Sequence, residues 1–259
     1  MTDTDDIQTR LEDGVLILRL NRPTKKNAVT LPMYSKLGDA LLDAAHNTAV
    51  RVVVLTGHEN GFSSGNDLAD FTPDHILNND DPVIRYMYAL ATLEKPIIAA
   101  VNGLAIGIGA TTLLNCDLVY AGHGTRFQFP FVNLGICPEF ASTFLLPRIM
   151  GHARAAELTF FGDVFSAEKA HEYGLINAVL EPGEVEAHAL ERAHTLARKP
   201  PAAMRVTKQL MKRWTNADVR EAIRVEAEHF MPMFGSEEVR EAVTAFQEKR
   251  KPDFSHFWK

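Results

Sequence analysis

Short runs of apolar residues recur along the first two thirds of the chain, and each run ends at a residue typical of turns, such as Asn21 or Gly57. These runs are apolar throughout instead of alternating with polar residues, which is typical of strands that are buried on both faces. The predicted strands cover residues 15–20, 51–56, 97–101, 117–121 and 175–180.

Apolar residues at helical spacing fill most of the segments between these strands. Thr30 is well placed to cap the first of these helices, and a glycine follows each of the last two. The predicted helices cover residues 32–46, 82–93, 107–114, 152–161 and 167–173. Because strands and helices alternate, the sequence predicts an α/β fold.

The pattern changes near residue 184, after which no strand is predicted. Helices are expected at residues 184–197, 201–213, 217–230 and 236–249, with a break at Lys199-Pro200-Pro201. We therefore divide the chain into an α/β core over residues 1–198 and a helical region over residues 199–259. The apolar face of the last helix, with Val239, Val243 and Phe246, packs either on the core or against a neighbouring subunit.

The composition is that of an ordinary globular protein, with 46% hydrophobic and 23% charged residues in a chain of 259. The 33 acidic residues outnumber the 27 basic ones, and a net charge of -6 argues against non-specific binding to nucleic acid. Two cysteines, Cys116 and Cys137, exclude a disulfide framework, and the ten histidines lack the spacing of metal ligands. We expect no metal site.

The N-terminal residues are acidic and polar, unlike a targeting leader. The longest apolar stretch, residues 97–114, contains Asn102 and three glycines, so strand, turn and helix are expected there instead of a membrane span. The last three residues are not the S-K-L type of peroxisomal address. These features predict a cytoplasmic protein with no membrane association.

The segment from Gly61 to Gly65 matches G-x-S-x-G, the pattern of a serine nucleophile elbow, with Ser63 as the nucleophile. An elbow follows its strand directly, whereas here three residues after Gly57 intervene. A glycine-rich turn that exposes backbone N–H groups is the favoured interpretation.

A second glycine turn lies at Gly107-Ile108-Gly109. It does not complete the dinucleotide-binding pattern, because Thr112 stands at the third glycine position and the turn begins six residues after its strand. At the start of a helix, however, such a turn has unpaired N–H groups that favour negative charge. The two glycine turns could together supply two N–H donors to one oxyanion.

Glu139 is the only acidic residue between Asp117 and Glu157, and its neighbours are mostly phenylalanine, proline and aliphatic residues. Burial among such residues would raise the pKa of its carboxyl group, which suits a general base. The alternative from composition alone is a solvated loop glutamate.

Two basic clusters, Lys25-Lys26 and residues 249–251, are either solvated or able to hold phosphates.

Taken together, these segments resemble the crotonase, or enoyl-CoA hydratase/isomerase, superfamily over residues 16–254. The segments that carry the resemblance, in order, are 21–23, 27–28, 53–57, 62–67, 95–103, 121–122, 134–135, Pro138 and 246–251. The resemblance implies a spiral of ββα units with a C-terminal helical trimerisation region. It also implies a homotrimer or hexamer that acts on acyl-CoA thioesters without a separate cofactor.

Matched position by position, the resemblance places the two N–H donors of an oxyanion hole at Asn66 and Ile108. It implies that Lys25 and the residues around Ser64, including Asp67, border the CoA. Further along the chain, it implies that Phe246 and Lys249 reach the adenosine end of a ligand bound by a neighbouring subunit.

Two departures from the hydratase pattern bear on the reaction. Hydratases of this superfamily carry two glutamates, and Thr111 and Phe131 stand at those positions here. Hydration needs one group to activate water and another to protonate carbon, so efficient hydration is not expected. Glu139 instead matches the single catalytic glutamate of peroxisomal-type Δ3,Δ2-enoyl-CoA isomerases, for which one base is sufficient.

Two other classes of function remain open. Ring isomerases of aromatic-derived CoA esters also place one acid at the position of Glu139, commonly aspartate, and 2-enoyl-CoA hydration is a further variant of the family's chemistry. A non-catalytic homologue that binds CoA or RNA is the other alternative. The acidic balance argues against RNA, and the retention of Glu139 argues against an inactive scaffold.

Overall fold

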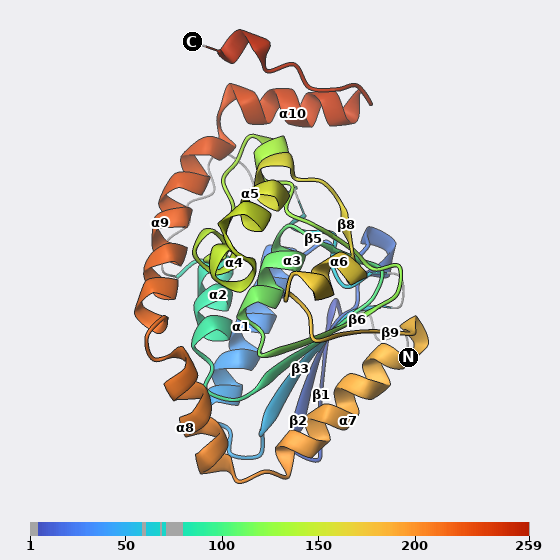
Figure 1. The fold of residues 1–259 in the computed structure, drawn as a ribbon, viewed down its shortest axis with the longest axis vertical. Helices are drawn as coiled ribbons and strands as arrows, with labels where there is room; N and C mark the ends of the chain where they lie inside the picture. Colours follow the sequence, from blue (N-terminus) through green and yellow to red (C-terminus); the bar gives the residue numbers. More distant parts are fainter. Residues whose placement is uncertain (1–4, 59–60, 68, 71–79, 259) are drawn as a thin grey trace.

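The computed structural model describes residues 5–58, 61–67, 69–70 and 80–258 (Figure 1). A six-stranded sheet in the order β1-β2-β3-β4-β6-β9 forms its centre. The edge strand β1 is antiparallel to β2, and the remaining neighbours are parallel. The bounds are β1 Ile7–Glu12, β2 Val15–Leu20, β3 Val52–Thr56, β4 Ile97–Val101, β6 Leu118–Gly122 and β9 Ala178–Leu180.

The central strands are buried on both faces, as their continuous apolar runs predict. Because side chains alternate along a strand, Val52 and Val54 face helix α7 (Val185–Ala197), whereas Val53 and Leu55 face the larger core. Helix α1 (Leu31–His46) and helix α2 (Pro82–Thr92) pack together within that larger core. The sheet is thus covered by helices on both sides.

A second, smaller sheet lies beyond the carboxyl end of β4. It contains β5 (Leu104–Ile106), β7 (Arg126–Gln128) and β8 (Phe165–Ser166), in the order β5-β7-β8. Strand β5 leads directly into the short helix α3 (Ile108–Thr111), and a 3-10 turn, η2 (Thr112–Asn115), continues it. The loops at this edge of the large sheet therefore converge on α3.

Of the remaining helices before α7, the first two pack against each other, and the third packs on β7, β8 and β9. They are α4 (Ser142–Met150), α5 (His152–Phe161) and α6 (Ala167–Glu172). The other short 3-10 turns are η1 (Pro23–Lys25), η3 (Val132–Leu134), η4 (Pro182–Glu184) and η5 (Ser255–Phe257). No helix in the described ranges is both long enough and apolar enough to cross a membrane.

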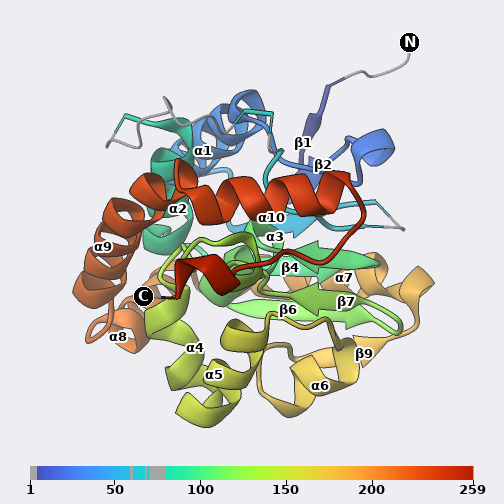
Figure 2. The same cartoon turned by 90° about the horizontal axis from the view of Figure 1, so that it is seen from above.

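Three helices follow α7: α8 (Pro201–Lys212), α9 (Asn216–Phe234) and α10 (Glu237–Gln247). Helices α8 and α10 lie at opposite ends of the long axis, with α9 between them (Figure 1). Helix α9 contacts α2 and α4, and α10 packs on η3 with Val239 buried (Figure 2). Val239 of α10 therefore packs on the core, which was one of the two alternatives for this face, whereas contact with a neighbouring subunit stays a prediction. Helix α8 also exposes Val206, Leu210, Met211 and Trp214.

The predicted elements are present, with differences at their ends. Thr30 does cap α1, since its side chain accepts a hydrogen bond from the Met33 N–H at 3.4 Å. The predicted helix 107–114 is divided into α3 and η2, and the strand predicted at 175–180 is reduced to three residues. The sequence did not predict β1, whose residues are mostly polar and exposed. It also missed β5, β7 and β8, which have only two or three residues each, and α4, which contains Pro147.

Candidate active site

The first glycine turn belongs to residues 61–67, which follow β3 in the chain. In space, this extended segment pairs with the loop after β2 on one side and with strand β5 on the other. Ser63 exchanges backbone hydrogen bonds with β5 at 2.9 and 3.0 Å, and Val29 exchanges two at 2.9 Å with the residues that flank Asn66. In this parallel pairing the N–H of Asn66 itself points away from Val29. It has no acceptor among the residues that the structure describes.

The second glycine turn joins β5 to α3 and lies against the first. Gly65 and Gly107 both have positive φ, +103° and +56°. A methyl group on Gly65 would lie 3.3 Å from the carbonyl oxygen of Ile106, and one on Gly107 would lie 3.9 Å from the Gly65 Cα. Asn66 and Ile108, which follow these glycines, therefore present their backbone N–H groups from adjacent turns. Like that of Asn66, the Ile108 N–H finds no acceptor in the described part of the chain.

The nucleophile-elbow hypothesis for Ser63 is wrong. Ser63 is buried, and its hydroxyl group donates to the Asn27 carbonyl oxygen at 2.9 Å and accepts from the Gly65 N–H at 3.2 Å. This hydroxyl holds the turn together and is not presented to a substrate. The alternative is confirmed only in part. The segment is a glycine-rich turn, but each N–H from Gly61 to Gly65 is hydrogen-bonded, and only the N–H of the following Asn66 lacks an acceptor in the described part of the chain.

Glu139 lies in the loop before α4 and is 5% exposed, so it is not a solvated loop residue. Burial, followed by the nearby charge of Glu226, raises the pKa of its carboxyl group to about 8. Its Oε1 atom is buried and has no hydrogen-bond partner within the described ranges. Three of the phenylalanines near Glu139 in the sequence, Phe129, Phe131 and Phe140, are also buried. A carboxylate with a free oxygen in such surroundings can accept a proton from a bound molecule.

Two tyrosines connect Glu139 with the glycine turns. Tyr34 of α1 donates a hydrogen bond to the side-chain oxygen of Asn66, and its ring lies 5.4 Å from that of Tyr86 on α2. Tyr86 in turn lies 5.8 Å from the ring of Phe140, next to Glu139. Burial and then the charge of Glu139 raise the pKa of Tyr34, so its hydroxyl group remains protonated. The carboxylate and the two turns thus share one part of the core.

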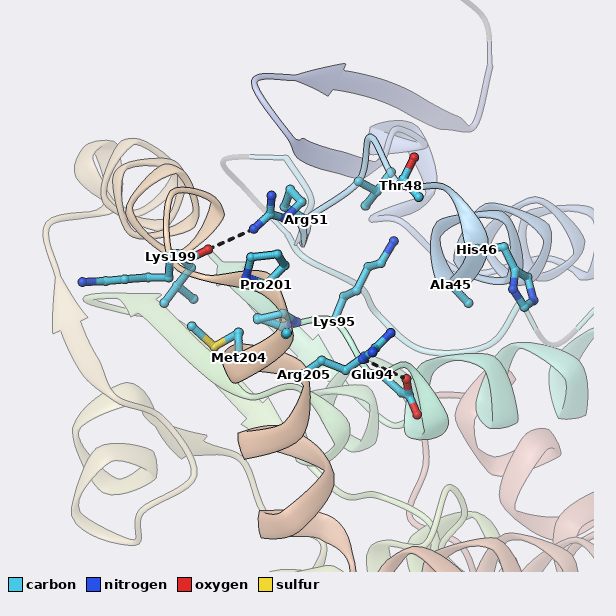
Figure 3. A pocket seen from close by; sticks show the side chains of 14 residues that line it. Ala45, His46, Thr48, Arg51, Glu94, Lys95, Lys199, Pro201, Met204 and Arg205 are labelled. Carbon is cyan, nitrogen blue, oxygen red and sulfur yellow. Dashed lines mark hydrogen bonds and ion pairs between the residues drawn. The ribbon is translucent and has the colours of Figure 1, made fainter.

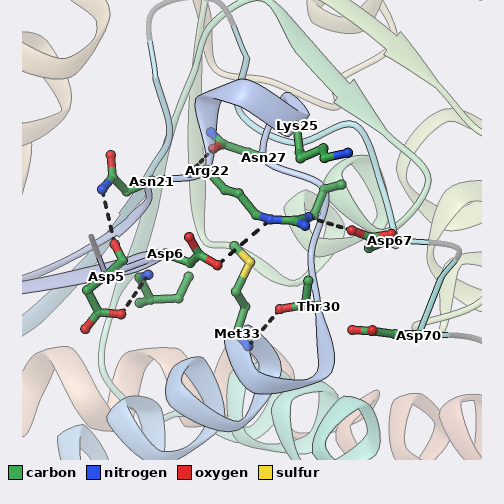
Figure 4. Close-up of polar contacts among 12 residues, drawn as sticks. Asp5, Asp6, Asn21, Arg22, Lys25, Asn27, Thr30, Met33, Asp67 and Asp70 are labelled. Atoms are coloured by element: carbon green, nitrogen blue, oxygen red, sulfur yellow. Dashed lines mark hydrogen bonds and ion pairs between the residues drawn. The ribbon is translucent and has the colours of Figure 1, made fainter. Parts of the chain in front are cut away.

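An ion pair fixes the end of the first glycine turn (Figure 4). The Arg22 guanidinium donates to Asp67 at 2.6 Å and to the Ala28 carbonyl oxygen at 3.2 Å. The hydrogen bond from Arg22 lowers the pKa of Asp67 below its usual value. Asp67, which the resemblance places beside the CoA, thus has a structural contact in addition to its predicted role.

The other residues expected near the CoA lie on the rim of the first turn or at the end of α10. Lys25 is exposed, and Ser64 is half-buried and donates from Oγ to the Lys25 carbonyl oxygen at 3.4 Å. Lys249 is exposed, just after α10. The side chain of Phe246 lies outside the described residues. The structure brings Lys25 and Ser64 together, whereas their contact with CoA remains a prediction.

Thr111 and Phe131, which stand at the hydratase glutamate positions, are both buried. Thr111 is fully buried in α3, and its hydroxyl group donates to the Ile108 carbonyl oxygen at 3.5 Å. Phe131 is 3% exposed and belongs to the larger core. No group of three His, Cys, Asp or Glu side chains able to hold a metal ion occurs in the described part of the chain.

A cleft of about 390 Å³ lies at the opposite edge of the sheet, where β3 and β4 begin (Figure 3). Two of the cations that line it, Lys95 and Arg51, already have partners. Lys95 donates to the carbonyl oxygens of Ala44 and Asn47, at 2.5 and 2.7 Å, and thereby caps α1. Arg51 donates to the Lys199 carbonyl oxygen at 2.9 Å, between α7 and α8. We interpret this cleft as a place where helix ends meet, and not as a binding site.

The sequence analysis did not single out Tyr34 or Glu226. Tyr34 lies on the apolar face of α1 and was indistinguishable from a core residue. Glu226 did leave a signal, because it occupies the same face of α9 as the buried residues Val219, Ile223 and Phe230. A carboxylate at a core-facing position of a helix could have been recognised as unusual.

Comparison with known proteins assigns the chain and its fold to a class. A family model described as enoyl-CoA hydratase/isomerase matches residues 10–256. The chain belongs to the enoyl-CoA hydratase/isomerase family, as the resemblance predicts. Its crotonase-type α/β fold is confirmed by an enoyl-CoA hydratase/isomerase from Pseudoalteromonas atlantica T6c. That structure has a TM-score of 0.93 at 37% identity, over 97% of this chain and 100% of the other.

The curated relatives carry several activities. The chain is 34% identical to 1,2-epoxyphenylacetyl-CoA isomerase of Escherichia coli K12, over 96% of this chain and 98% of the relative. It is 35% identical to enoyl-CoA delta isomerase 2 of Rattus norvegicus, over 93% of this chain and 63% of the relative. Hydratases occur at similar identity. The family therefore establishes an enzyme with enoyl-CoA hydratase/isomerase chemistry on acyl-CoA thioesters.

Proposed function

We propose that the protein is a Δ3,Δ2-enoyl-CoA isomerase that uses Glu139 as its single base. The observation that carries this proposal is that Oε1 of Glu139 is buried and has no hydrogen-bond partner among the described residues. A second carboxylate at either hydratase position is absent from the sequence, where Thr111 and Phe131 stand. The delta isomerase among the relatives supports the same reaction.

In the proposed mechanism the thioester carbonyl oxygen accepts hydrogen bonds from the N–H groups of Asn66 and Ile108. A proton on C2 of a 3-enoyl thioester is too weak an acid for a carboxylate unless the developing dienolate oxygen is stabilised. One such N–H donor is typically worth about 3 kcal/mol of the barrier. Glu139 takes the proton from C2 and returns it to C4, which leaves the double bond conjugated at C2–C3.

The remaining predicted residues would hold the CoA and exclude water. Lys25, Ser64 and Asp67 would border the CoA at the first turn, and Thr111 and Phe131 would occupy space that water fills in a hydratase. Phe246 and Lys249 would reach the adenosine end of a ligand in a neighbouring subunit. The substrate itself contains the CoA, so no other cofactor is needed for a proton shift.

Assembly into a homotrimer or hexamer is part of the proposal. The exposed apolar side chains of α8, including Leu210 and Trp214, offer a surface for subunit contact. Measurement of the mass in solution by light scattering tests this part, and a monomer would contradict it. A cytoplasmic location also remains a prediction.

The test is conjugation of a 3-enoyl-CoA, followed by ultraviolet absorbance. We expect Glu139→Gln to lower kcat by about 100- to 10,000-fold, because it removes the base with little change of shape. Binding of a saturated acyl-CoA should persist in this variant. Glu157→Gln, which changes an exposed glutamate of α5, is the matched control and should retain full activity. Unchanged turnover by Glu139→Gln would refute the proposal.

The second candidate is ring isomerisation of an aromatic-derived CoA ester, which the 34% identical epoxyphenylacetyl-CoA isomerase favours. A substrate panel with 3-enoyl-CoA, 2-enoyl-CoA and epoxyphenylacetyl-CoA distinguishes the alternatives. Preference for the epoxide would favour this candidate. Efficient hydration of 2-enoyl-CoA would contradict the interpretation of Thr111 and Phe131.

A further inference from the structure

A second carboxylate, Glu226 of α9, is buried beside the loop that carries Glu139. It is 5% exposed, and no Lys, Arg or His forms an ion pair with it in the described ranges. Its Oε2 accepts a hydrogen bond from the Ala141 N–H at 2.6 Å, and its Oε1 accepts from the N–H and Oγ1 of Thr143 at 2.9 and 2.5 Å. Both of its oxygens are therefore occupied, in contrast to the free Oε1 of Glu139.

The backbone held by Glu226 is strained. Phe140 and Ala141, directly after Glu139, both have left-handed conformations, with φ of 62° and 58°. Two consecutive non-glycine residues in this region require support from the surrounding structure. Helix α4 begins immediately afterwards and has no side-chain cap of its own at Ala141. Glu226 supplies the missing acceptor from 85 residues away.

We propose that Glu226 is a positioning residue, which fixes the left-handed turn after Glu139 and so directs the Glu139 carboxylate toward the substrate. This inference rests on the proposed role of Glu139 as the base. It gives the C-terminal helical region a part in the reaction, because α9 lies beyond the α/β core. Glu226 itself does not touch the reacting atoms.

The charge of Glu226 has a second effect on the same site. After burial, it is the nearby charge that raises the pKa of Glu139. The other titratable groups around Glu139 are Tyr34 of α1, Tyr86 of α2 and Cys137 of its own loop, and burial raises the pKa of each of these above its usual value. They stay neutral near pH 8, so removal of the Glu226 charge should lower the pKa of Glu139.

The experiment compares Glu226→Gln with the wild type on a 3-enoyl-CoA across pH. Glutamine keeps one acceptor oxygen and loses the charge, so part of the support for the turn is lost. We expect kcat to fall by about 10- to 100-fold with KM little changed, because a small misplacement of a reacting group has effects of this size. The acid limb of kcat/KM should move to lower pH. Glu228→Gln, on an exposed face of the same helix, is the control and should behave as wild type.

A measurement without turnover separates this inference from the proposed function. Carbon-13 labelled glutamate allows the Glu139 carboxyl signal to be titrated by NMR, with Glu139→Gln to assign it. A lower Glu139 pKa in Glu226→Gln supports the inference even if the wild type does not isomerise 3-enoyl-CoA, an outcome that would refute only the proposed function. The inference would be overturned if the Glu139 pKa were the same in Glu226→Gln as in the wild type and the activity per folded molecule were also unchanged.

If Glu226→Gln does not fold, Thr143→Val tests whether Glu226 positions Glu139. This change removes one of the three hydrogen bonds to Glu226 and keeps both charges. We expect kcat to fall by about 2- to 10-fold at unchanged KM, as one hydrogen bond allows. An unchanged kcat in this folded variant would overturn the inference.

Discussion

The hydroxyl group of Tyr34 donates a hydrogen bond to the side-chain oxygen of Asn66 from a fully buried position in α1. Asn66 directly follows Gly65, the residue of the first glycine turn whose positive φ favours glycine. The bond therefore ties the backbone N–H proposed for the oxyanion hole to the rigid core of the protein. It also places a hydroxyl donor close to Glu139, whose charge acts on the pKa of Tyr34 after burial.

Removal of this hydroxyl group should impair catalysis more than folding. Tyr34→Phe keeps the ring and its contact with Tyr86, but it leaves Asn66 without its donor. We expect kcat on a 3-enoyl-CoA to fall by about tenfold, the equivalent of one hydrogen bond of about 1.4 kcal/mol. Tyr88→Phe is the control, since that half-buried hydroxyl only contacts the Arg220 carbonyl oxygen. Equal activity of both variants would show that the Tyr34 bond is not needed.

The reaction should depend on pH through Glu139. A base must be ionised to accept a proton, and the pKa of Glu139 in the free protein is about 8. We expect kcat/KM to rise with pH through a limb centred near 8, because this ratio reports groups of the free enzyme. Initial rates at saturating and limiting substrate, from pH 6 to 9.5, provide the measurement. A kcat/KM that does not change with pH over this range would mean that the pKa of the base is not raised.

Stability should decrease as the pH rises from about 5 to 8. Burial raises the pKa of Glu139 to about 8 and that of Glu226 to about 7, whereas both groups ionise near 4.5 in the unfolded chain. Between these values the folded state binds more protons than the unfolded state, so the free energy of unfolding falls with pH, by on the order of a few kcal/mol. Urea unfolding at pH 5.5 and 7.5 measures this change.

Glu139→Gln should make this dependence shallower, because glutamine does not ionise and only the contribution of Glu226 remains. Glu228→Gln should retain the wild-type slope, since Glu228 is exposed and paired with Arg224. If stability instead rises over this range in the wild type, the two buried carboxylates do not have raised pKa values.

The first glycine turn should not tolerate a side chain. In Gly65→Ala the new methyl group would lie 3.3 Å from the Ile106 carbonyl oxygen at a φ of +103°. The turn must shift, and we expect kcat to fall by about 100-fold and stability by about 1 to 3 kcal/mol. Gly124→Ala is the matched control, because Gly124 also has positive φ but open space around it. That variant should lose stability only; loss of kcat in both would show that the contact with Ile106 is irrelevant.

A buried ion pair far from the site should affect stability alone. Lys208 of α8 donates to Asp117 at 2.6 Å and to the Lys95 carbonyl oxygen at 2.7 Å, beside the start of β4. Lys208→Met leaves the partly buried Asp117 with only the more distant cation of Lys212, and we expect a loss of about 2 to 3 kcal/mol in urea unfolding. Lys212→Met should have a smaller effect, since Lys212 lies 4.0 Å from Asp117 and is more exposed. A lower kcat per folded molecule would show coupling between this ion pair and the site.

Much of the fold is visible in the sequence, because parallel strands buried on both faces require continuous apolar runs. This is why β2, β3 and β4 could be predicted almost to the residue. The short strands β5, β7 and β8 could not, since two or three residues leave no periodic pattern and their pairing depends on the larger sheet.

By itself, the sequence determined the two glycine turns, the isolated Glu139 and the missing hydratase glutamates, because each depends on residue type at a position. Only the tertiary structure decided what these residues contact. Tyr34 and Asn66 are 32 residues apart, and Ala141 and Glu226 are 85 apart. No local pattern encodes such pairs, because they come together only when the helices pack and exclude water from the groups between them.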